Sequence, residues 1–218
     1  GSVFPPKAEN LRVVDGAYRF DLHTEGLTLT DLILGMPGRH NVENAIAAST
    51  IALRLGVAPE LLRHGLATFK GVARRFDTRI RGPQVVFIDD YAHHPKELDA
   101  CIASIREMYP GKRITGVFQP HLFSRTRDLA GDFATSLATL DELLLLEIYP
   151  AREEPIPGIT SQWLLDLVPM AAKAVVAKDE LLQALQAMEV EVLVTMGAGD
   201  IDRLVPSIER MLNERYRP

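Results

Sequence analysis

The stretch "VVFIDDYAHHPKEL", residues 85–98, joins a short apolar run to the expected start of a helix. Two acidic residues, a tyrosine and two histidines lie between the apolar run and the helix start. A continuous apolar run is typical of a strand buried on both faces, and Pro95 suits the first turn of a helix. The stretch therefore predicts a β-α unit whose connecting loop carries the ionisable groups.

The same alternation continues toward the end of the chain. Further apolar runs occupy residues 113–118, 142–148, 173–177 and 191–195. Helical patterns are expected from Leu98, over about 125–138, after Thr160, over 179–188 and from near Asp200. Repeated β-α units predict an α/β fold, with a parallel sheet covered by helices on both faces.

The first third of the chain has a different pattern. Residues 11–34 alternate apolar and polar side chains around Asp15-Gly16, which predicts a β-hairpin. Helical spacing follows from Asn41 to a C-terminal Gly56, and Pro59 begins a second helix over 59–69. The boundary between the two parts is expected within residues 69–76.

Composition narrows the classes of function. The 218 residues are 47% hydrophobic, but no run reaches the roughly 18 apolar residues of a membrane span. We therefore expect a cytoplasmic protein with no membrane partner. A net charge of -5 argues against nucleic acid as a partner. The single cysteine, Cys101, excludes an intrachain disulfide and is expected to be a buried structural thiol. The oligomeric state is left open.

Polar residues follow the ends of several expected strands. In an open α/β sheet, ligands bind outside the carboxyl ends of the strands. The residues expected at that edge are Asp89, Asp90, Tyr91, His93, His94, His121, Arg125, Arg127, Glu147, Tyr149 and the "MGAGD" segment at 196–200. The sequence thus predicts a ligand site along this edge.

Several of these residues have a second, structural interpretation. Asp89 is favoured as part of a solvated turn or helix cap. Of His93 and His94, one is expected at a ligand and the other in packing or solvent. Arg125 and Arg127 are expected at a helix start, where at least one should bind an anion because a cation there opposes the helix dipole.

Two kinds of site lack a strong signal. A His-Asp metal site is disfavoured because the spaced ligand set is missing. "GAGD" fits a tight βα turn better than a phosphate cradle, and no Gly-x-x-x-x-Gly-Lys-Ser/Thr loop occurs.

Six motifs in this order resemble the Mur ligases: "GMPGRHNVENAIAA" (35–48), "GVARRFD" (71–77), "DDYAHHPKE" (89–97), "FQPHLFSRTRD" (118–128), "LLEIYPAREEPIPG" (145–158) and "GAGDI" (197–201). The resemblance spans nearly the whole chain. It implies that residues 1–72 end an ATP-binding central domain and that 73–218 form a Rossmann-like C-terminal domain. The chain is then expected to be a piece of a longer protein, as Gly1-Ser2, which resembles a cloning remnant, also indicates.

The resemblance also implies a reaction. ATP would phosphorylate the carboxylate of UDP-N-acetylmuramate, the amine of L-alanine would attack the acyl phosphate, and phosphate would leave. The implied cofactors are ATP and Mg²⁺, with the magnesium ligands and phosphate-loop lysine outside this chain. The alternatives are ligation of a recycled L-alanyl-γ-D-glutamyl-meso-diaminopimelate tripeptide, or a module that binds a ligand without catalysis.

Residue roles are implied in the same way. Asn41 and Asn44 match positions near the nucleotide, although Asn41 also suits a helix cap. Arg75 matches a phosphate-binding arginine, and Asp90 a contact to the ribose. The amino-acid pocket matches Tyr91, His93, His121 and Arg125, and catalytic roles fall to Arg75 and His93.

Two further positions bear on this resemblance. Some relatives carry an arginine where this chain has Leu122, which places more of the carboxylate binding on Arg125, or brings in Arg127. The "FKGVAR" segment, residues 69–74, is the expected hinge for domain closure.

Overall fold

A computed structural model describes residues 5–14, 16–24 and 26–217. The chain divides into two compact units, residues 1–72 with 103–110 and residues 73–102 with 111–218. The division falls inside the expected boundary segment, but the assignment of the two parts to domains of a longer ligase stays a prediction. None of the helices in the described ranges combines the length and apolar character needed to cross a bilayer.

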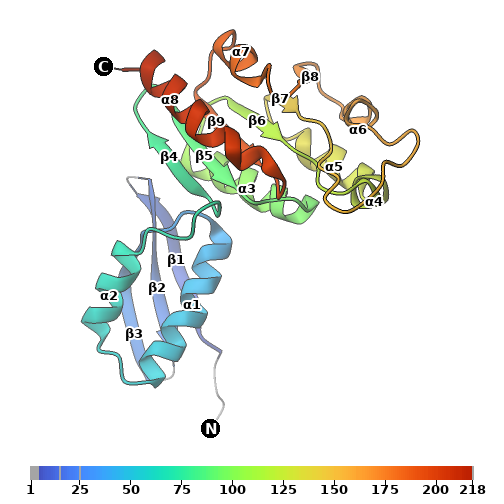
Figure 1. The fold of residues 1–218 in the computed structure, drawn as a ribbon. Helices are drawn as coiled ribbons and strands as arrows, with labels where there is room; N and C mark the ends of the chain where they lie inside the picture. The colour runs from blue at the N-terminus through green and yellow to red at the C-terminus, as the bar shows by residue number, and fades with distance from the viewer. Residues whose placement is uncertain (1–4, 15, 25, 218) are drawn as a thin grey trace. The chain divides into compact units, whose positions relative to one another are not determined.

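The first unit contains a three-stranded antiparallel sheet. Its strands are β1 (Lys7–Val14), β2 (Ala17–Thr24) and β3 (Leu27–Leu34), in the order β1-β2-β3 (Figure 1). The expected hairpin is therefore incomplete, because a second turn at Gly26 adds a third strand. Gly16 lies in the left-handed region (φ 71°), whereas Asp15 of the expected turn lies outside the described residues. The alternation buries Tyr18, Phe20 and Leu22 on one face.

Two helices of this unit pack against the sheet. They are α1 (Arg39–Arg54) and α2 (Pro59–Thr68). Helix α1 begins two residues before the expected Asn41 and is followed by Gly56 in the left-handed region (φ 84°), as the sequence predicts. Val42 and Ala45 of α1 and Leu62 of α2 are buried, so the helices complete a small core.

The second unit is built on a six-stranded sheet. Its strands are β4 (Asp77–Arg81), β5 (Val86–Asp90), β6 (Ile114–Phe118), β7 (Glu142–Leu145), β8 (Lys173–Val175) and β9 (Val192–Met196), in the order β4-β5-β9-β6-β7-β8. The last five are parallel, which confirms the α/β prediction. β4 pairs antiparallel with β5 at the edge of the sheet. This strand was not predicted, because its polar, basic sequence lacks the run of apolar residues that indicates a buried strand.

Seven helical segments accompany this sheet: α3 (Pro95–Met108), α4 (Phe123–Asp128), α5 (Ala130–Leu137), α6 (Ser161–Leu167), α7 (Leu181–Gln186), the 3₁₀ segment η1 (Asp200–Leu204) and α8 (Val205–Arg215). The prediction of a single helix over 125–138 is wrong. The chain leaves helical geometry at Leu129 (φ -114°, ψ 17°) and forms α4 and α5 instead. Thr160 caps α6, since its hydroxyl accepts a hydrogen bond from the Trp163 N–H.

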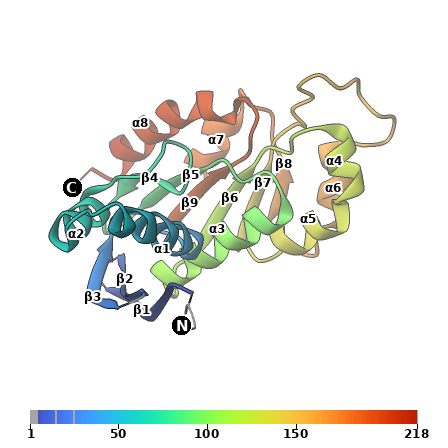
Figure 2. The ribbon, with the colours of Figure 1, turned by 90° about the horizontal axis from the view of Figure 1, so that it is seen from below.

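Helices cover both faces of the sheet, as Figure 2 shows. Apolar residues of α7 and α8, including Leu185 and Ile208, pack with Phe87 and Leu193 of the strands on one face. α3 and α5 lie on the other face. Cys101 of α3 is 1% exposed, which confirms the expected buried thiol, and burial raises its pKa.

Candidate active site

The loops after β5, β6, β7 and β9 meet at one edge of the second unit. Parallel pairing of β5, β9 and β6 brings their carboxyl ends together, and an isolated bridge joins His121 after β6 to Tyr149 after β7. The polar loop residues therefore gather where an open α/β sheet binds its ligands.

A row of four rings runs along this edge. Tyr91 meets His93 edge to face with centroids 5.2 Å apart, and His93 meets His121 in the same way at 6.0 Å. His121 then stacks on Tyr149 at 5.6 Å. The structure thus brings together Tyr91, His93 and His121, predicted for one pocket, and adds Tyr149, which the sequence placed at the edge without a role.

Three side-chain nitrogens in this region are buried without a hydrogen bond among the described residues. They are His121 Nδ1, Arg125 Nη1 and Arg74 Nε, of which the last lies near the Asp89 carboxylate. A buried polar atom without a hydrogen bond is costly, so such atoms mark a place where a ligand can supply the missing partner. Burial, and then the Arg125 charge, lower the pKa of His121, so its imidazole is neutral at pH 7. The Arg125 guanidinium beside a neutral His121 imidazole can therefore bind an anionic group of a ligand.

The two neighbouring arginines of α4 have different surroundings. Because α4 has only six residues, both Arg125 and Arg127 fall in its last turn. The expectation of a helix start is therefore wrong for Arg127, and Arg125, the third residue, belongs to the first turn and the last turn at once. Arg127 is exposed and its Nε lies 2.7 Å from Asp128 Oδ1. Arg125 is half-buried. Of the two, Arg125 is the one available to a buried anion.

The adjacent histidines also differ. His93 Nδ1 lies 2.9 Å from the Tyr91 carbonyl oxygen and 3.3 Å from Glu97 Oε2. His94 precedes α3, where its carbonyl accepts hydrogen bonds from the backbone N–H groups of Glu97 and Leu98. The structure therefore places His93 in the row of rings and gives His94 a role at the helix start.

Asp89 does not lie in a solvated turn or at a helix cap, so that interpretation is wrong. It is the fourth residue of β5 and is 2% exposed. The Thr195 hydroxyl donates to its Oδ1 at 2.7 Å, and Arg74 Nε lies 3.6 Å from its Oδ2. Burial raises the pKa of this carboxyl. Asp89 is buried because all five residues of β5 are covered, on both faces of the sheet.

Asp90 holds the backbone on both sides of its strand end. Its Oδ2 accepts from the Phe76 N–H and its Oδ1 from the Ala92 N–H, both at 2.7 Å. It is 8% exposed, and burial raises its pKa to about 6. The structure gives Asp90 this structural task, and its expected contact with a ribose stays a prediction.

Arg74 also lies at this edge of the sheet, although the sequence pattern did not indicate it. Its guanidinium carbon lies 4.9 Å from the Tyr91 ring centroid, and its Nη2 donates to the Gly197 carbonyl at 2.6 Å. The two adjacent arginines, Arg74 and Arg75, cannot be distinguished from the sequence, because only the fold shows which of them faces the strand ends. Arg75 is exposed and forms no side-chain hydrogen bond or ion pair within the described part of the chain, so its phosphate-binding role stays a prediction.

The "GAGD" segment forms a tight turn after β9. A Cβ added at Gly199 would lie 2.3 Å from Gln119 Oε1 and 2.7 Å from Tyr149 Cβ. Asp200 accepts hydrogen bonds from Gln119 Nε2 and Lys178 Nζ, both at 2.8 Å, using different carboxylate oxygens. The segment is thus a packed connection, as one of its two interpretations predicts.

The remaining predicted residues, Asn41 and Asn44, lie on α1 of the first unit. Asn41 is in the first helical turn, and its amide donates to the Pro37 carbonyl at 2.5 Å. It is therefore not the N-cap, since Gly38 holds that position. Asn44 is exposed and its amide lies 3.4 Å from Asn41 Oδ1. Their nucleotide contacts stay predictions.

Metal ligands are not assigned to this chain. Among residues 5–14, 16–24 and 26–217, no group of three or more His, Cys, Asp or Glu side chains is placed to hold a metal ion.

A parallel sheet with helices on both faces and ligand-facing loops at its carboxyl edge defines a Rossmann-like α/β binding domain. Residues 74–199 match the family model described as Mur ligase, glutamate ligase domain. Since this match takes in more than half of the chain, the protein belongs to the Mur ligase family.

Individual relatives make the comparison more specific. A UDP-N-acetylmuramate–L-alanine ligase of Parabacteroides distasonis is 51% identical over 210 residues, which are 96% of this chain and 46% of that protein. The solved UDP-N-acetylmuramate-alanine ligase of Thermotoga maritima is 28% identical with a TM-score of 0.78, over 98% of this chain and 46% of that one. A murein peptide ligase of Psychrobacter arcticus, 20% identical with a TM-score of 0.59 over 95% of this chain and 44% of that one, shares the fold. The chain spans about half the length of the curated relatives it matches.

Proposed function

We propose that the whole protein, of which this chain is a part, joins L-alanine to the carboxyl group of UDP-N-acetylmuramate with consumption of ATP. The product is a precursor of peptidoglycan, and we place the reaction in the cytoplasm. The observation that carries the proposal is the 51% identity to the Parabacteroides distasonis ligase over nearly the whole chain.

The chemistry follows from the reacting groups. A carboxylate is a poor electrophile, so transfer of the γ-phosphoryl group of ATP first supplies a leaving group. The amine of L-alanine then attacks the acyl phosphate, and the tetrahedral intermediate expels phosphate. The main task of the protein is to position the reactants and to neutralise charge. Mg²⁺ supplies part of that charge when bound, and its ligands belong to the rest of the protein.

We assign the amino-acid side of this reaction to the row of rings and α4. Arg125 binds the alanine carboxylate, because its buried Nη1 lacks a partner among the described residues. The neutral His121 lies beside it and adds no competing charge. Tyr91 and His93 complete the pocket wall.

His93 is assigned the proton transfer. Both neighbours of its Nδ1, the Tyr91 carbonyl and the Glu97 carboxylate, are acceptors, so Nδ1 carries the proton in the neutral ring. Its Nε2 is then left with a lone pair that can accept a proton from the alanine amine.

The nucleotide side is assigned to Arg75, Asn41, Asn44 and Asp90. The exposed guanidinium of Arg75 forms no ion pair within the described residues and suits the ATP phosphates, where it would assist catalysis. The amide of Asn44 is exposed and suits the purine or ribose. Asp90 would reach the ribose through carboxylate lone pairs that its two backbone bonds leave unused.

The test is release of ADP by the full-length protein given ATP, Mg²⁺ and UDP-N-acetylmuramate. L-alanine is compared with glycine, L-serine and the L-alanyl-γ-D-glutamyl-meso-diaminopimelate tripeptide. Turnover that requires both the UDP-sugar and L-alanine supports the proposal. Turnover with free N-acetylmuramate species and the tripeptide alone would reassign the protein to cell-wall recycling, and binding without turnover would leave a non-catalytic module.

A further inference from the structure

The loop that follows β7, residues 146–160, is attached to the start of α4. The Glu153 carboxylate accepts a hydrogen bond from the Ser124 N–H at 2.9 Å and a second one from the Ser124 hydroxyl. Ser124 is the second residue of α4, and Arg125 is the third. One carboxylate therefore joins the loop to the helical turn that carries the proposed alanine-binding arginine.

The residue before this helix has an unusual backbone. Leu122 has φ 73° and ψ 132°, a conformation that side chains with a Cβ rarely adopt. It lies directly between His121 and α4, so its backbone angles set the direction of His121 relative to Arg125. A strained conformation of this kind persists only where the surroundings determine it, and such residues gather at functional sites.

The same loop fixes the other side of Leu122. The Leu122 N–H donates to the Tyr149 carbonyl at 2.9 Å, and the Tyr149 N–H donates to the Pro120 carbonyl at 2.8 Å. The Tyr149 ring also stacks on His121. Residues 149–153 thus hold residues 120–124 at both ends, by Tyr149 before the strained turn and by Glu153 after it.

From these contacts we propose that Glu153 is a positioning residue of the amino-acid pocket. By holding the first turn of α4 it maintains the strained Leu122 backbone, and through it the placement of His121 and Arg125. The inference rests on the proposed function, because it takes this pocket to be the site of the amine substrate.

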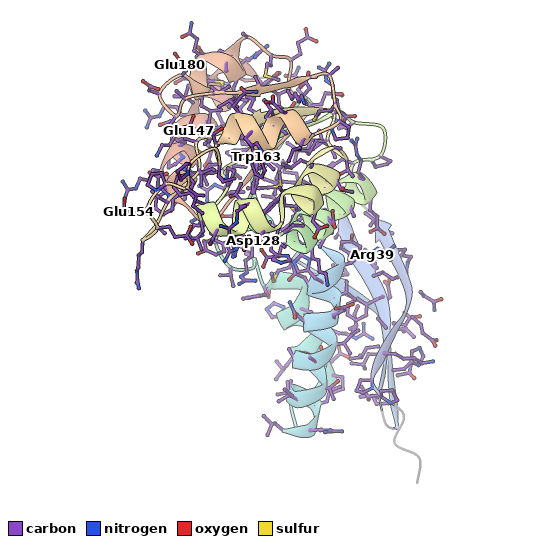
Figure 3. The ribbon with its side chains drawn as sticks, turned by 90° about the vertical axis from the view of Figure 1, so that its right-hand side faces the viewer. Arg39, Asp128, Glu147, Glu154, Trp163 and Glu180 are labelled. Atoms are coloured by element: carbon purple, nitrogen blue, oxygen red, sulfur yellow. The ribbon has the colours of Figure 1, made fainter. Side chains whose placement is uncertain are left out.

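The negative charge of Glu153 distinguishes the positioning role from that of a helix cap that only accepts hydrogen bonds, because the charge also acts on His121. The Glu153 carboxylate favours the protonated form of His121 and so opposes the lowering of its pKa by burial. Glu154, the next residue, is exposed, and Figure 3 labels it on the same loop. It forms no side-chain hydrogen bond or ion pair to any residue that the structure describes, so it provides a matched control with the same charge and nearly the same position.

The experiment uses the full-length protein with Glu153→Gln and, as control, Glu154→Gln. The glutamine keeps one acceptor for Ser124 and removes the charge. We expect the KM for L-alanine to rise roughly tenfold in Glu153→Gln, with the KM values for ATP and the UDP-sugar within about twofold of wild type. Glu154→Gln should match wild type for all three substrates. NMR titration should also show a lower pKa for His121 in Glu153→Gln only.

The outcomes are distinct. Equal KM increases for all three substrates, or Glu153→Gln kinetics equal to those of Glu154→Gln, would overturn the positioning role. If Glu153→Gln does not fold, Ser124→Ala removes only the hydroxyl contact, and an unchanged KM for L-alanine would then count against the role. If wild type uses the tripeptide instead, the proposed substrate is wrong and the KM comparison is made with that amine. If wild type turns over neither, the proposed function fails and the His121 titration decides the positioning role.

Discussion

Replacement of Arg125 by alanine should weaken L-alanine binding while leaving the fold intact. In the free protein, Arg125 Nη1 is buried without a partner among the described residues, so the substitution removes no hydrogen bond of that atom. We therefore expect the melting temperature of Arg125→Ala to stay close to that of wild type. The loss should occur only when the carboxylate of the substrate arrives and finds no cation.

The size of that loss follows from burial. Truncating one partner of a buried, hydrogen-bonded charge pair costs about 2–5 kcal/mol. Because Arg125 is half-buried, the lower part of this range applies, about 2–3 kcal/mol, which corresponds to a roughly 30- to 150-fold rise in the KM for L-alanine. The KM for ATP should change by less than about threefold, since the contact proposed for Arg125 is with the amino acid.

The assay is steady-state ADP release by the full-length protein, with L-alanine and ATP varied in turn. Arg127→Ala is the matched control, because Arg127 lies two residues away, is exposed and pairs with Asp128. It should behave as wild type. Equal rises in the two KM values, or an Arg127→Ala effect as large as that of Arg125→Ala, would refute the assignment of the carboxylate to Arg125.

Three other predictions concern stability, measured by urea or thermal unfolding. Thr195→Val removes the hydroxyl that donates to Asp89 and should cost about 1–3 kcal/mol, so an unchanged midpoint would contradict it. Since the pKa of Asp90 is raised from 3.8 to about 6, the stabilisation from its protonated form is complete below pH 3.8 and is lost as the pH rises through 6. The stability of wild type minus that of Asp90→Asn should fall across this window, and a flat difference would refute the raised pKa. Gly199→Ala places a Cβ 2.3 Å from a side-chain oxygen and should destabilise by about 1–3 kcal/mol, whereas Gly131→Ala in α5 meets nothing within 4 Å and should stabilise by about 0.5–1 kcal/mol; equal shifts would be inconsistent with both.

The interior parallel strands were predictable because strands that are buried on both faces have continuous apolar sequences. β5 and β9 are such strands, and the structure places both in the centre of the sheet. β8 has an apolar sequence too, but it lies at the edge of the sheet and is only partly buried, so burial on both faces is the wrong expectation for it. β4 was not predictable in this way, because an edge strand needs few apolar residues. The break at Leu129 was also hidden, since apolar spacing continues across it and only the backbone angles show the end of α4.

The gathering of polar residues at the carboxyl ends of the strands was predictable from the sequence, and the individual contacts were less so. The polar loops at the strand ends and the motifs of the family indicated Tyr91, His93, His121 and Arg125. The role of Arg74 depends on which of two adjacent arginines faces Tyr91, and that of Glu153 on a contact 29 residues away in sequence. Contacts of this kind are set by packing and leave no local pattern.

The position of β9 in the sheet has a consequence for how this protein folds while it is being synthesised. β9 lies between β5 and β6, although residues 91–191 separate it from β5 in the chain. While the polypeptide is being made, β5 with β4 and β6 with β7 and β8 therefore expose strand edges that only β9 can join. Non-local pairing of this kind is slow, and unpaired edges associate with other chains. A nascent chain that stalls before β9 should thus be the form of this protein most dependent on chaperones, and a substitution that weakens β9 should lower the yield of folded protein more than one in the edge strand β8.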